Sequence, residues 1–348
     1  MSKAIFAAFI AVLGLDGAAS AAETCPLPSV ADTVALNPVP GSDLMTVPVE
    51  INGKPKQFLL NLSTNRTEVS QAAVAELGLP ESAKAVTPLQ YGGGDIMAAP
   101  GAGISVPVYE TKGGQGLADL RTGVRIGTFT IGRATGRNLQ FVVSDDKEMG
   151  KSKPYDGLLT NDFFKQYDVE LDFGGKAVSY LTPTQCADPN LVAYWSHFSV
   201  AVVPMTITDG RIEVPVTIDG HAVNAVIDTS SQRSVMRRDI AELTFGLKAD
   251  APGMMPAGDL KDGLGQPVYG HTFPRISLQD VTAANVPVLI QTNSMIANSN
   301  RETVLGSRAQ TTEAHIPDLT IGMDVLHQLH LYIVFGQKKI YVTSAVLN

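Results

Sequence analysis

Two segments of the sequence read almost alike: residues 47–70 are VPVEINGKPKQFLLNLSTNRTEVS, and residues 214–237 are VPVTIDGHAVNAVIDTSSQRSVMR. They align without a gap at an offset of 167 residues, and seven of the 24 positions are identical. The identical residues are Val47, Pro48, Val49, Ile51, Gly53, Ser63 and Arg66, matched by Val214, Pro215, Val216, Ile218, Gly220, Ser230 and Arg233. A repeat of this kind indicates that one structural unit is present twice.

A second pair of segments extends the repeat. Residues 155–180, YDGLLTNDFFKQYDVELDFGGKAVSY, match residues 317–342, PDLTIGMDVLHQLHLYIVFGQKKIYV, at an offset of 162 residues. Both pairs recur in the same order, so a unit of about 140 residues is duplicated. We expect an N-terminal segment at 23–44, a first lobe at 45–182, a connector without counterpart at 183–198 and a second lobe at 199–348.

Each copy shows the same local pattern. Alternating apolar residues predict a strand that turns at Asn52-Gly53 in one copy and at Asp219-Gly220 in the other, both typical of tight hairpins. Short apolar runs at Phe58–Leu60 and Ala225–Ile227 predict buried strands. In the first copy a helix covering Val69, Ala73 and Leu77 should follow. Short helices at Phe163–Tyr167 and Val325–Leu329 should precede the strands VELDF and LYIVF.

Composition agrees with a turn-rich β protein. Charged residues make up only 17% of the chain, and 32 glycines and 21 prolines supply turns, which excludes a coiled coil, a helical bundle or a disordered chain. The net charge is −8 and no basic cluster is present, so we expect no nucleic-acid partner. Beyond the N-terminus no apolar run approaches the ~18 residues of a membrane span.

The first 22 residues have the three parts of a secretory signal. Lys3 gives the positive region, Ala4–Leu15 the apolar region, and small residues allow cleavage after Ala21 or Ala22. We therefore expect a secreted or periplasmic protein. An oxidising compartment favours a disulfide between the two cysteines, Cys25 and Cys186, although two unpaired buried thiols are an open alternative.

A polar loop follows the buried strand of the second copy, reading Val226-Ile227-Asp228-Thr229-Ser230-Ser231. A carboxylate at the end of a buried strand is costly unless it is hydrogen-bonded, which suggests a purpose. Here the sequence resembles the retropepsin-like and pepsin-like aspartic peptidases, whose signature is two apolar residues, Asp-Thr/Ser-Gly and a small residue. Their second element, an apolar pair, Gly and a short helix, is matched at Ile321-Gly322 and, with Thr160 in place of Gly, at Leu158-Leu159. The resemblance extends from about Thr46 to Thr343.

The resemblance implies an all-β, bilobal acid-protease-like fold: two duplicated retropepsin-like β-barrel lobes with short helices and a cleft between them. In the family, two Asp loops meet, and their carboxylates share one proton and position the attacking water. A Gly-tipped flap closes over a peptide or protein substrate, and no cofactor is needed. Tyr91, Gly92, Gly93 and Gly94 suit a flap in the first lobe and Gly258–Gly265 in the second; both could equally be surface turns.

The sequence departs from the family at the site itself. Asn61 stands where the first lobe should carry its Asp (61 + 167 = 228), and an amide cannot share the proton or act as a base. Leu62 replaces the Thr whose hydroxyl braces the opposing loop in the family, and Ser63 and Ser230 replace the glycine that lets backbone N–H groups approach the carboxylate.

Two hypotheses follow. The protein is either an aspartic-type peptidase using Asp228, Thr229, Ser230 and Asn61, or a pseudopeptidase that binds an extended peptide without hydrolysis. Pairing of two Asp228 loops in a homodimer is disfavoured, because the tethered first lobe competes at about millimolar effective concentration; we expect a monomer. His327 and His330 are three residues apart but lack a third ligand at a familiar spacing, so we predict no metal site.

Overall fold

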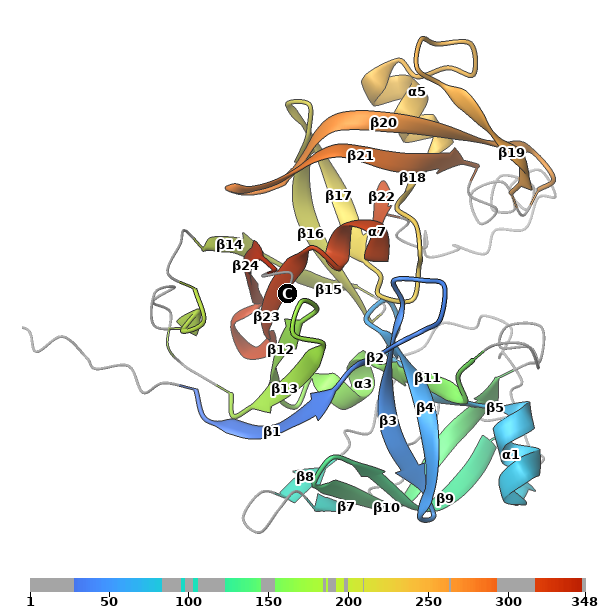
Figure 1. Ribbon diagram of the computed structural model, residues 1–348, viewed down its shortest axis with the longest axis vertical. Coiled ribbons are helices and arrows are strands. Elements are labelled where there is room, and N and C mark those ends of the chain that lie inside the picture. The colour runs from blue at the N-terminus through green and yellow to red at the C-terminus, as the bar shows by residue number, and fades with distance from the viewer. Residues whose placement is uncertain are drawn as a thin grey trace, which may run out of the picture.

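The computed structural model describes residues 28–82, 95–97, 103–105, 123–144, 154–183, 186, 192–196, 200–208, 210–262, 264–292 and 317–345. Strands dominate these residues and form three sheets. Two sheets build two lobes that lie at opposite ends of the molecule, and the third sheet lies between them (Figure 1).

The first lobe is a strongly curved sheet in which strands distant in sequence pair. Its central strands are β3 (Met45–Ile51) and β4 (Lys54–Asn61), and β4 pairs in parallel with β11 (Gly157–Thr160). The other strands are β2 (Asn37–Pro38), β5 (Glu68–Ser70), β6 (Glu81–Ser82), β7 (Asp95–Met97), β8 (Gly103–Ser105), β9 (Gly123–Ile131) and β10 (Ala134–Ser144). The helices are α1 (Gln71–Leu77) and α3 (Asn161–Phe164).

The second lobe repeats this arrangement. β16 (Arg211–Ile218) and β17 (His221–Ile227) form the central hairpin, and β17 pairs in parallel with β22 (Leu319–Ile321), as β4 does with β11. The other strands are β15 (Thr206–Thr208), β18 (Val235–Arg237), β19 (Met255–Lys261), β20 (Pro267–Leu278) and β21 (Val281–Gln291). The helices are α5 (Arg238–Phe245) and α7 (Met323–Leu326). Both halves of the sequence repeat therefore lie side by side in each lobe.

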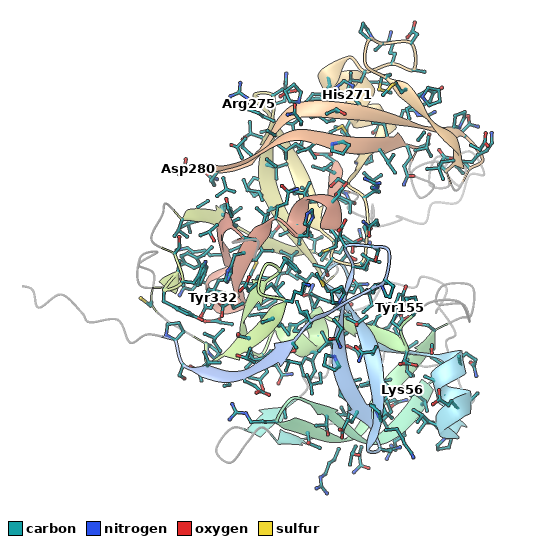
Figure 2. All side chains as sticks on the ribbon, in the orientation of Figure 1. Lys56, Tyr155, His271, Arg275, Asp280 and Tyr332 are labelled. Atoms are coloured by element: carbon teal, nitrogen blue, oxygen red, sulfur yellow. The ribbon has the colours of Figure 1, made fainter. Side chains whose placement is uncertain are left out.

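The third sheet belongs to both lobes, in the order β1-β13-β12-β23-β24-β14. The strands are β1 (Val30–Ala35), β12 (Asp168–Asp172), β13 (Ala177–Leu181), β14 (Ala201–Pro204), β23 (Leu329–Val334) and β24 (Lys339–Ser344), with the 3-10 turn η1 (Phe335–Gln337) before β24. The lobes join where β12 pairs antiparallel with β23, placing Glu170 opposite Tyr332. Tyr332 is fully buried in this shared sheet (Figure 2).

The two predicted hairpin turns are confirmed. Asn52 and Gly53 have φ values of 50° and 74°, and Asp219 and Gly220 have 45° and 89°. Positive φ at both central residues matches the right-handed twist of the flanking strands, and Asn, Asp and Gly adopt it at little cost.

The predicted helices begin at different residues from those expected. Val69 lies on β5, and α1 begins only after Ser70, whose hydroxyl accepts the Ala73 N–H at 3.1 Å. This cap fixes the helix start, which apolar spacing alone does not reveal. The short helices α3 and α7 begin two residues earlier than predicted, at Asn161 and Met323.

The interior confirms the predicted all-β, bilobal acid-protease-like fold. The inward-facing residues of β3, β4 and their counterparts form one large apolar core. In the first lobe the Phe129 ring packs between Phe58 and Phe141, with ring centroids 5.5 and 4.9 Å away. In the same lobe Lys56 is buried, and its ammonium group is neutralised by Glu76 and Asp156 at 2.7 and 3.5 Å (Figure 2). Over the described part of the chain, no helix is long and apolar enough to cross a membrane.

The connector packs on the shared sheet. Trp195 stacks on the His330 ring at a centroid distance of 4.3 Å, and its indole N–H donates to Thr343 Oγ1 at 3.1 Å. The neighbouring Tyr194 hydroxyl donates to Glu170 Oε2 at 2.7 Å. Cys186 is buried and disulfide-bonded; because Cys25 lies outside the described residues, the pairing with Cys25 stays a prediction, as do the domain boundaries.

Candidate functional site

The loops that follow β4 and β17 meet between the lobes, and one hydroxyl joins them. Thr229 Oγ1 donates to the Leu60 carbonyl at 2.8 Å and accepts the Leu62 N–H at 3.1 Å. Thr229 is fully buried, so these bonds have no competition from water. Leu62, at the equivalent position of the first lobe, is also fully buried but has no hydroxyl to return the contact. The brace between the lobes is therefore one-sided.

Asp228 is held by three donors from its own loop. Its Oδ1 accepts the Ser230 N–H at 2.9 Å and the Ser230 hydroxyl at 2.6 Å, and its Oδ2 accepts the Ser231 hydroxyl at 2.7 Å. The residue is partly exposed. Ser231 was not among the site residues expected from sequence; the signal was the second serine in Asp-Thr-Ser-Ser.

Asn61 is oriented in the same way by its own loop. Its Oδ1 accepts the Ser63 N–H and the Ser63 hydroxyl, both at 2.8 Å. A backbone N–H can only donate, so this contact fixes which atom of the amide is oxygen. Serine at the family's glycine position thus keeps the backbone approach in both lobes and adds a hydroxyl bond to it.

A second pair of acids, Asp162 of α3 and Asp324 of α7, forms hydrogen bonds to the loops that follow β4 and β17. Asp162 accepts the Thr67 N–H at 3.1 Å and the Thr67 hydroxyl at 2.7 Å. Asp324 accepts the Ser234 N–H at 2.9 Å and the Ser234 hydroxyl at 2.7 Å. Sequence reasoning missed this pair, although both acids sit at equivalent positions of the repeat. These bonds fix α3 and α7 against the site loops.

Two further side chains, Asn161 and Gln232, bond across to the other lobe beside the site. Asn161 Nδ2 donates to the Leu62 carbonyl at 2.6 Å and to the Gly210 carbonyl at 2.9 Å. On the other flank, Asp43 N–H donates to Gln232 Oε1 at 2.9 Å and Gln232 Nε2 donates to Asp43 Oδ2 at 2.7 Å. These contacts hold the Asn61 and Asp228 loops in a fixed relation.

The histidines set aside as metal ligands have structural partners. His327 Nδ1 lies 2.6 Å from the Met323 carbonyl, and His330 Nε2 lies 2.9 Å from Glu170 Oε1. Burial alone would raise the pKa of the Glu170 carboxyl, but the hydrogen bonds from His330 and Tyr194 outweigh it, so the pKa lies below its ordinary value. Within the described ranges, no group of three or more His, Cys, Asp or Glu side chains could hold a metal.

The proposed flaps are only partly described. Tyr91, Gly92, Gly93 and Gly94 lie outside the described residues. In the second lobe, residues 255–261 form β19, an exposed edge strand paired with β20, with an irregular register between Pro256 and Lys261. The turn that follows is ordered around the Asp262 carboxylate, which accepts the N–H groups of Leu264 and Gln266, both at 2.9 Å. Its role as a flap stays a prediction.

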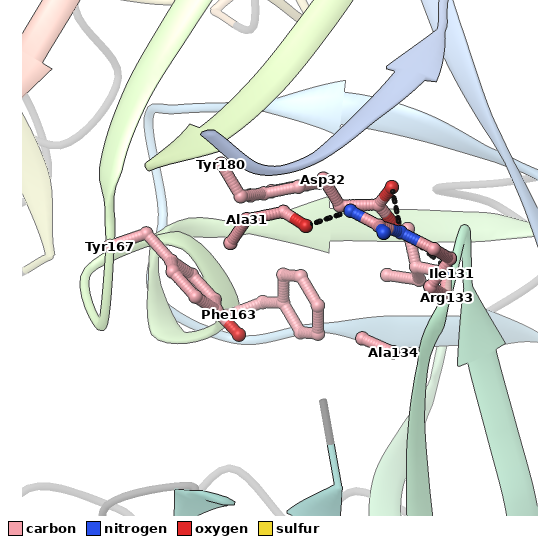
Figure 3. A pocket seen from close by; sticks show the side chains of 8 residues that line it. All are labelled: Ala31, Asp32, Ile131, Arg133, Ala134, Phe163, Tyr167 and Tyr180. Carbon is pink, nitrogen blue, oxygen red and sulfur yellow. Dashed lines mark hydrogen bonds and ion pairs between the residues drawn. The ribbon is translucent and has the colours of Figure 1, made fainter. Parts of the chain in front are cut away.

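A small hollow lies away from these loops, between β1, α3 and the β9–β10 turn (Figure 3). The Phe163, Tyr167 and Tyr180 rings line it, and an ion pair between Arg133 and Asp32, 3.1 Å apart, stands at one side. Burial and the Asp32 charge raise the pKa of Tyr167 to about 12. None of the residues predicted for the site line this hollow, and it has little room beyond a water molecule.

Comparison with known proteins finds one sequence-family model and solved structures to which this chain is similar. The sequence model of the aspartyl protease family matches residues 214–325, which is most of the second lobe. No curated protein matches the chain. Among solved structures, the chain is similar to conglutin gamma, a basic 7S globulin from lupine seeds, at 10% identity over 90% of this chain and 94% of that chain, with a TM-score of 0.45. It is also similar to basic 7S globulin from soybean, at 12% identity over 92% and 96%, with a TM-score of 0.45.

Proposed function

We propose that this protein is a pseudopeptidase: it binds an extended peptide between its lobes without cleaving it. Its second lobe matches the aspartyl protease model, but Asn61 stands where the resemblance implies the second carboxylate. The observation that carries the proposal is the pair Asn61 and Asp228. Two carboxylates are needed to share a proton, with one acting as base and the other as acid. Here the position opposite Asp228 holds an amide, which can donate hydrogen bonds but does not act as a base or as an acid near neutral pH.

The rest of the site supports binding. The loops are held by Thr229, Ser63, Ser230 and Ser231, so the surface between the lobes is preorganised. An edge strand such as β19 offers unpaired main-chain groups to an extended ligand. A peptide or protein is therefore the expected partner, bound by a monomer without a cofactor.

Peptide cleavage tests the proposal. The purified protein is incubated with a mixed peptide pool from about pH 3 to 7, beside Asp228→Ala and Asn61→Asp, and products are followed by mass spectrometry. We expect no cleavage by the wild type and cleavage by Asn61→Asp, in which the second carboxylate is restored. Cleavage by the wild type that disappears in Asp228→Ala would establish the alternative, a working aspartic-type peptidase, and overturn the proposal.

Export is part of the proposal. Residues 1–22 have the pattern of a cleavable signal, and a disulfide at Cys186 requires an oxidising compartment in most organisms. The intact mass of the protein recovered from separated cell fractions tests this. A chain lacking residues 1–21 or 1–22 in the periplasm or medium supports export, and a full-length chain confined to the cytoplasm contradicts it.

A further inference from the structure

The two lobes hold Asn61 and Asp228 by equivalent hydrogen bonds, but the two side chains differ at one atom. In each lobe the Oδ1 atom accepts two bonds from the serine two residues later, Ser63 for Asn61 and Ser230 for Asp228. These bonds use both lone pairs of Oδ1. What each side chain has left for a ligand is its other atom, which is the Nδ2 amino group in Asn61 and the Oδ2 oxygen in Asp228.

The Asn61 amino group is a free donor. Asn61 as a whole is 6% exposed, yet its Nδ2 bonds to nothing among the described residues and is not one of their enclosed, unsatisfied atoms. Solvent, or a ligand in its place, therefore reaches this atom. Because the Ser63 contacts hold Oδ1 in place, they also fix the position of the amino group.

Asp228 Oδ2 is the matching acceptor. It takes one bond, from the Ser231 hydroxyl, and a carboxylate oxygen has room for another. Thr229 holds the two groups near each other, because its hydroxyl bonds both Leu60 and Leu62, the residues on either side of Asn61. No direct hydrogen bond joins Asn61 to Asp228 among the bonds that the described residues make, so a third group can bridge them.

We propose that this donor–acceptor pair recognises a primary carboxamide, which carries an acceptor and a donor on one edge. The proposal rests on the proposed function and names the ligand chemistry of the same site. The carboxamide oxygen would accept from Asn61 Nδ2, and its N–H would donate to Asp228 Oδ2. Its source is a Gln or Asn side chain, or an amidated C-terminus.

Charged groups and the peptide unit match less well. A carboxylate offers only acceptors and meets the Asp228 charge, whereas ammonium and guanidinium groups offer only donors and leave the Asn61 amino group unpaired. A trans peptide unit has its C=O and N–H on opposite edges, so it serves one side chain at a time. Each unmatched buried polar group lowers affinity by about ten-fold or more.

Peptide binding at pH 7 tests the proposal. Fluorescein-labelled nonapeptide pools carry a fixed central Gln, Glu, Lys or Leu between mixed positions, and fluorescence polarisation reports their affinity. A second set, without central Gln or Asn, ends in either a carboxamide or a free carboxylate and distinguishes the two sources. We expect the Gln pool, or the amidated set, to bind about ten-fold more tightly than its counterparts.

Two variants change the pair in opposite ways. Asp228→Asn makes two donors, so the preference should pass to the Glu pool or to the free carboxylate. Asn61→Ala removes the donor, so the carboxamide should lose its advantage. Asp219→Asn and Asn138→Ala make the same types of change at two exposed positions, one in a hairpin turn and one on β10, and should leave the preference unchanged.

The outcomes separate the two proposals. Equal binding of the four central-residue pools without a preference for the amidated set, or a wild-type preference for Glu, Lys or Leu, overturns carboxamide recognition and leaves peptide binding standing. Failure of every pool to bind the folded wild type, with folding checked by circular dichroism, overturns both.

Discussion

Replacing Thr229 by Val tests how much one hydroxyl between the lobes contributes to the free energy of unfolding. Valine has nearly the same shape, so the change removes the hydroxyl and little else. It leaves the Leu60 carbonyl and the Leu62 N–H, which Thr229 Oγ1 meets at 2.8 and 3.1 Å, without these bonds in a region closed to water.

The expected cost follows from those two groups. Each buried backbone group that loses its partner costs about 1–3 kcal/mol, and a carbonyl with a second lone pair lies at the low end, so we expect a loss of about 3 kcal/mol in the free energy of unfolding. Because Leu62 has no hydroxyl, the first lobe makes no equivalent bond that would reduce the loss of stability. Thr229→Ser is the matched control: it keeps the hydroxyl and should lose only about 1 kcal/mol for the missing methyl group.

Urea unfolding followed by far-ultraviolet circular dichroism and by fluorescence measures the effect. Trp195 is the only tryptophan and lies against the shared sheet, so its emission reports the region where the lobes join. Similar m-values for the variants would show that the midpoint reflects stability alone. If Thr229→Val loses no more than Thr229→Ser, the hydroxyl is not the brace that we infer.

Three further predictions concern other contacts between the two lobes. Asn161→Ala, which leaves the Leu62 and Gly210 carbonyls without their donor, should lower the unfolding free energy by about 2 kcal/mol in urea titrations; an unchanged unfolding free energy would contradict this. Gly210→Ala should destabilise the protein by about 1–3 kcal/mol more than Gly220→Ala, since both have positive φ but only Gly210 would bring a Cβ within 2.3 Å of Asn65; equal midpoints would be the contrary result. Glu170, whose pKa is lowered by His330 and Tyr194, stabilises the folded state above its ordinary pKa of 4.5 and loses that contribution as the pH falls through the lowered value. Glu170→Gln should therefore cost stability at pH 7 and much less at pH 3, as thermal unfolding would show, and a pH-independent difference would contradict this reasoning.

The repeat made much of the fold predictable. Residues 47–70 and 214–237 carry their turns and buried strands in local patterns, and local patterns can be read from one chain. The position of Asn61 opposite Asp228 followed from the alignment of the two copies alone, without any knowledge of distances.

The remainder depends on contacts between distant residues. The strand pairing of Glu170 with Tyr332, the support of the site loops by Asp162 and Asp324, and the bond from Asn161 to Gly210 all join segments far apart in the chain. The repeat shows which residues are equivalent, but it does not show which residues touch. The start of α1 was misplaced because a single hydroxyl, Ser70, outweighs the apolar spacing that includes Val69. The anchoring by Ser63 and Ser230 was missed because serine was regarded as a lost glycine rather than as an added donor.

The shared sheet has a consequence for the order of folding. β1 begins at Val30 and β24 ends at Ser344, yet both belong to this sheet. During synthesis, β12 and β13 emerge well before β23, so β12 has an open edge until about 160 more residues have left the ribosome. Long-range pairing of this kind is slow, and an open edge invites pairing with other chains. A chain that crosses a membrane before folding would never expose that half-built sheet to the cytoplasm.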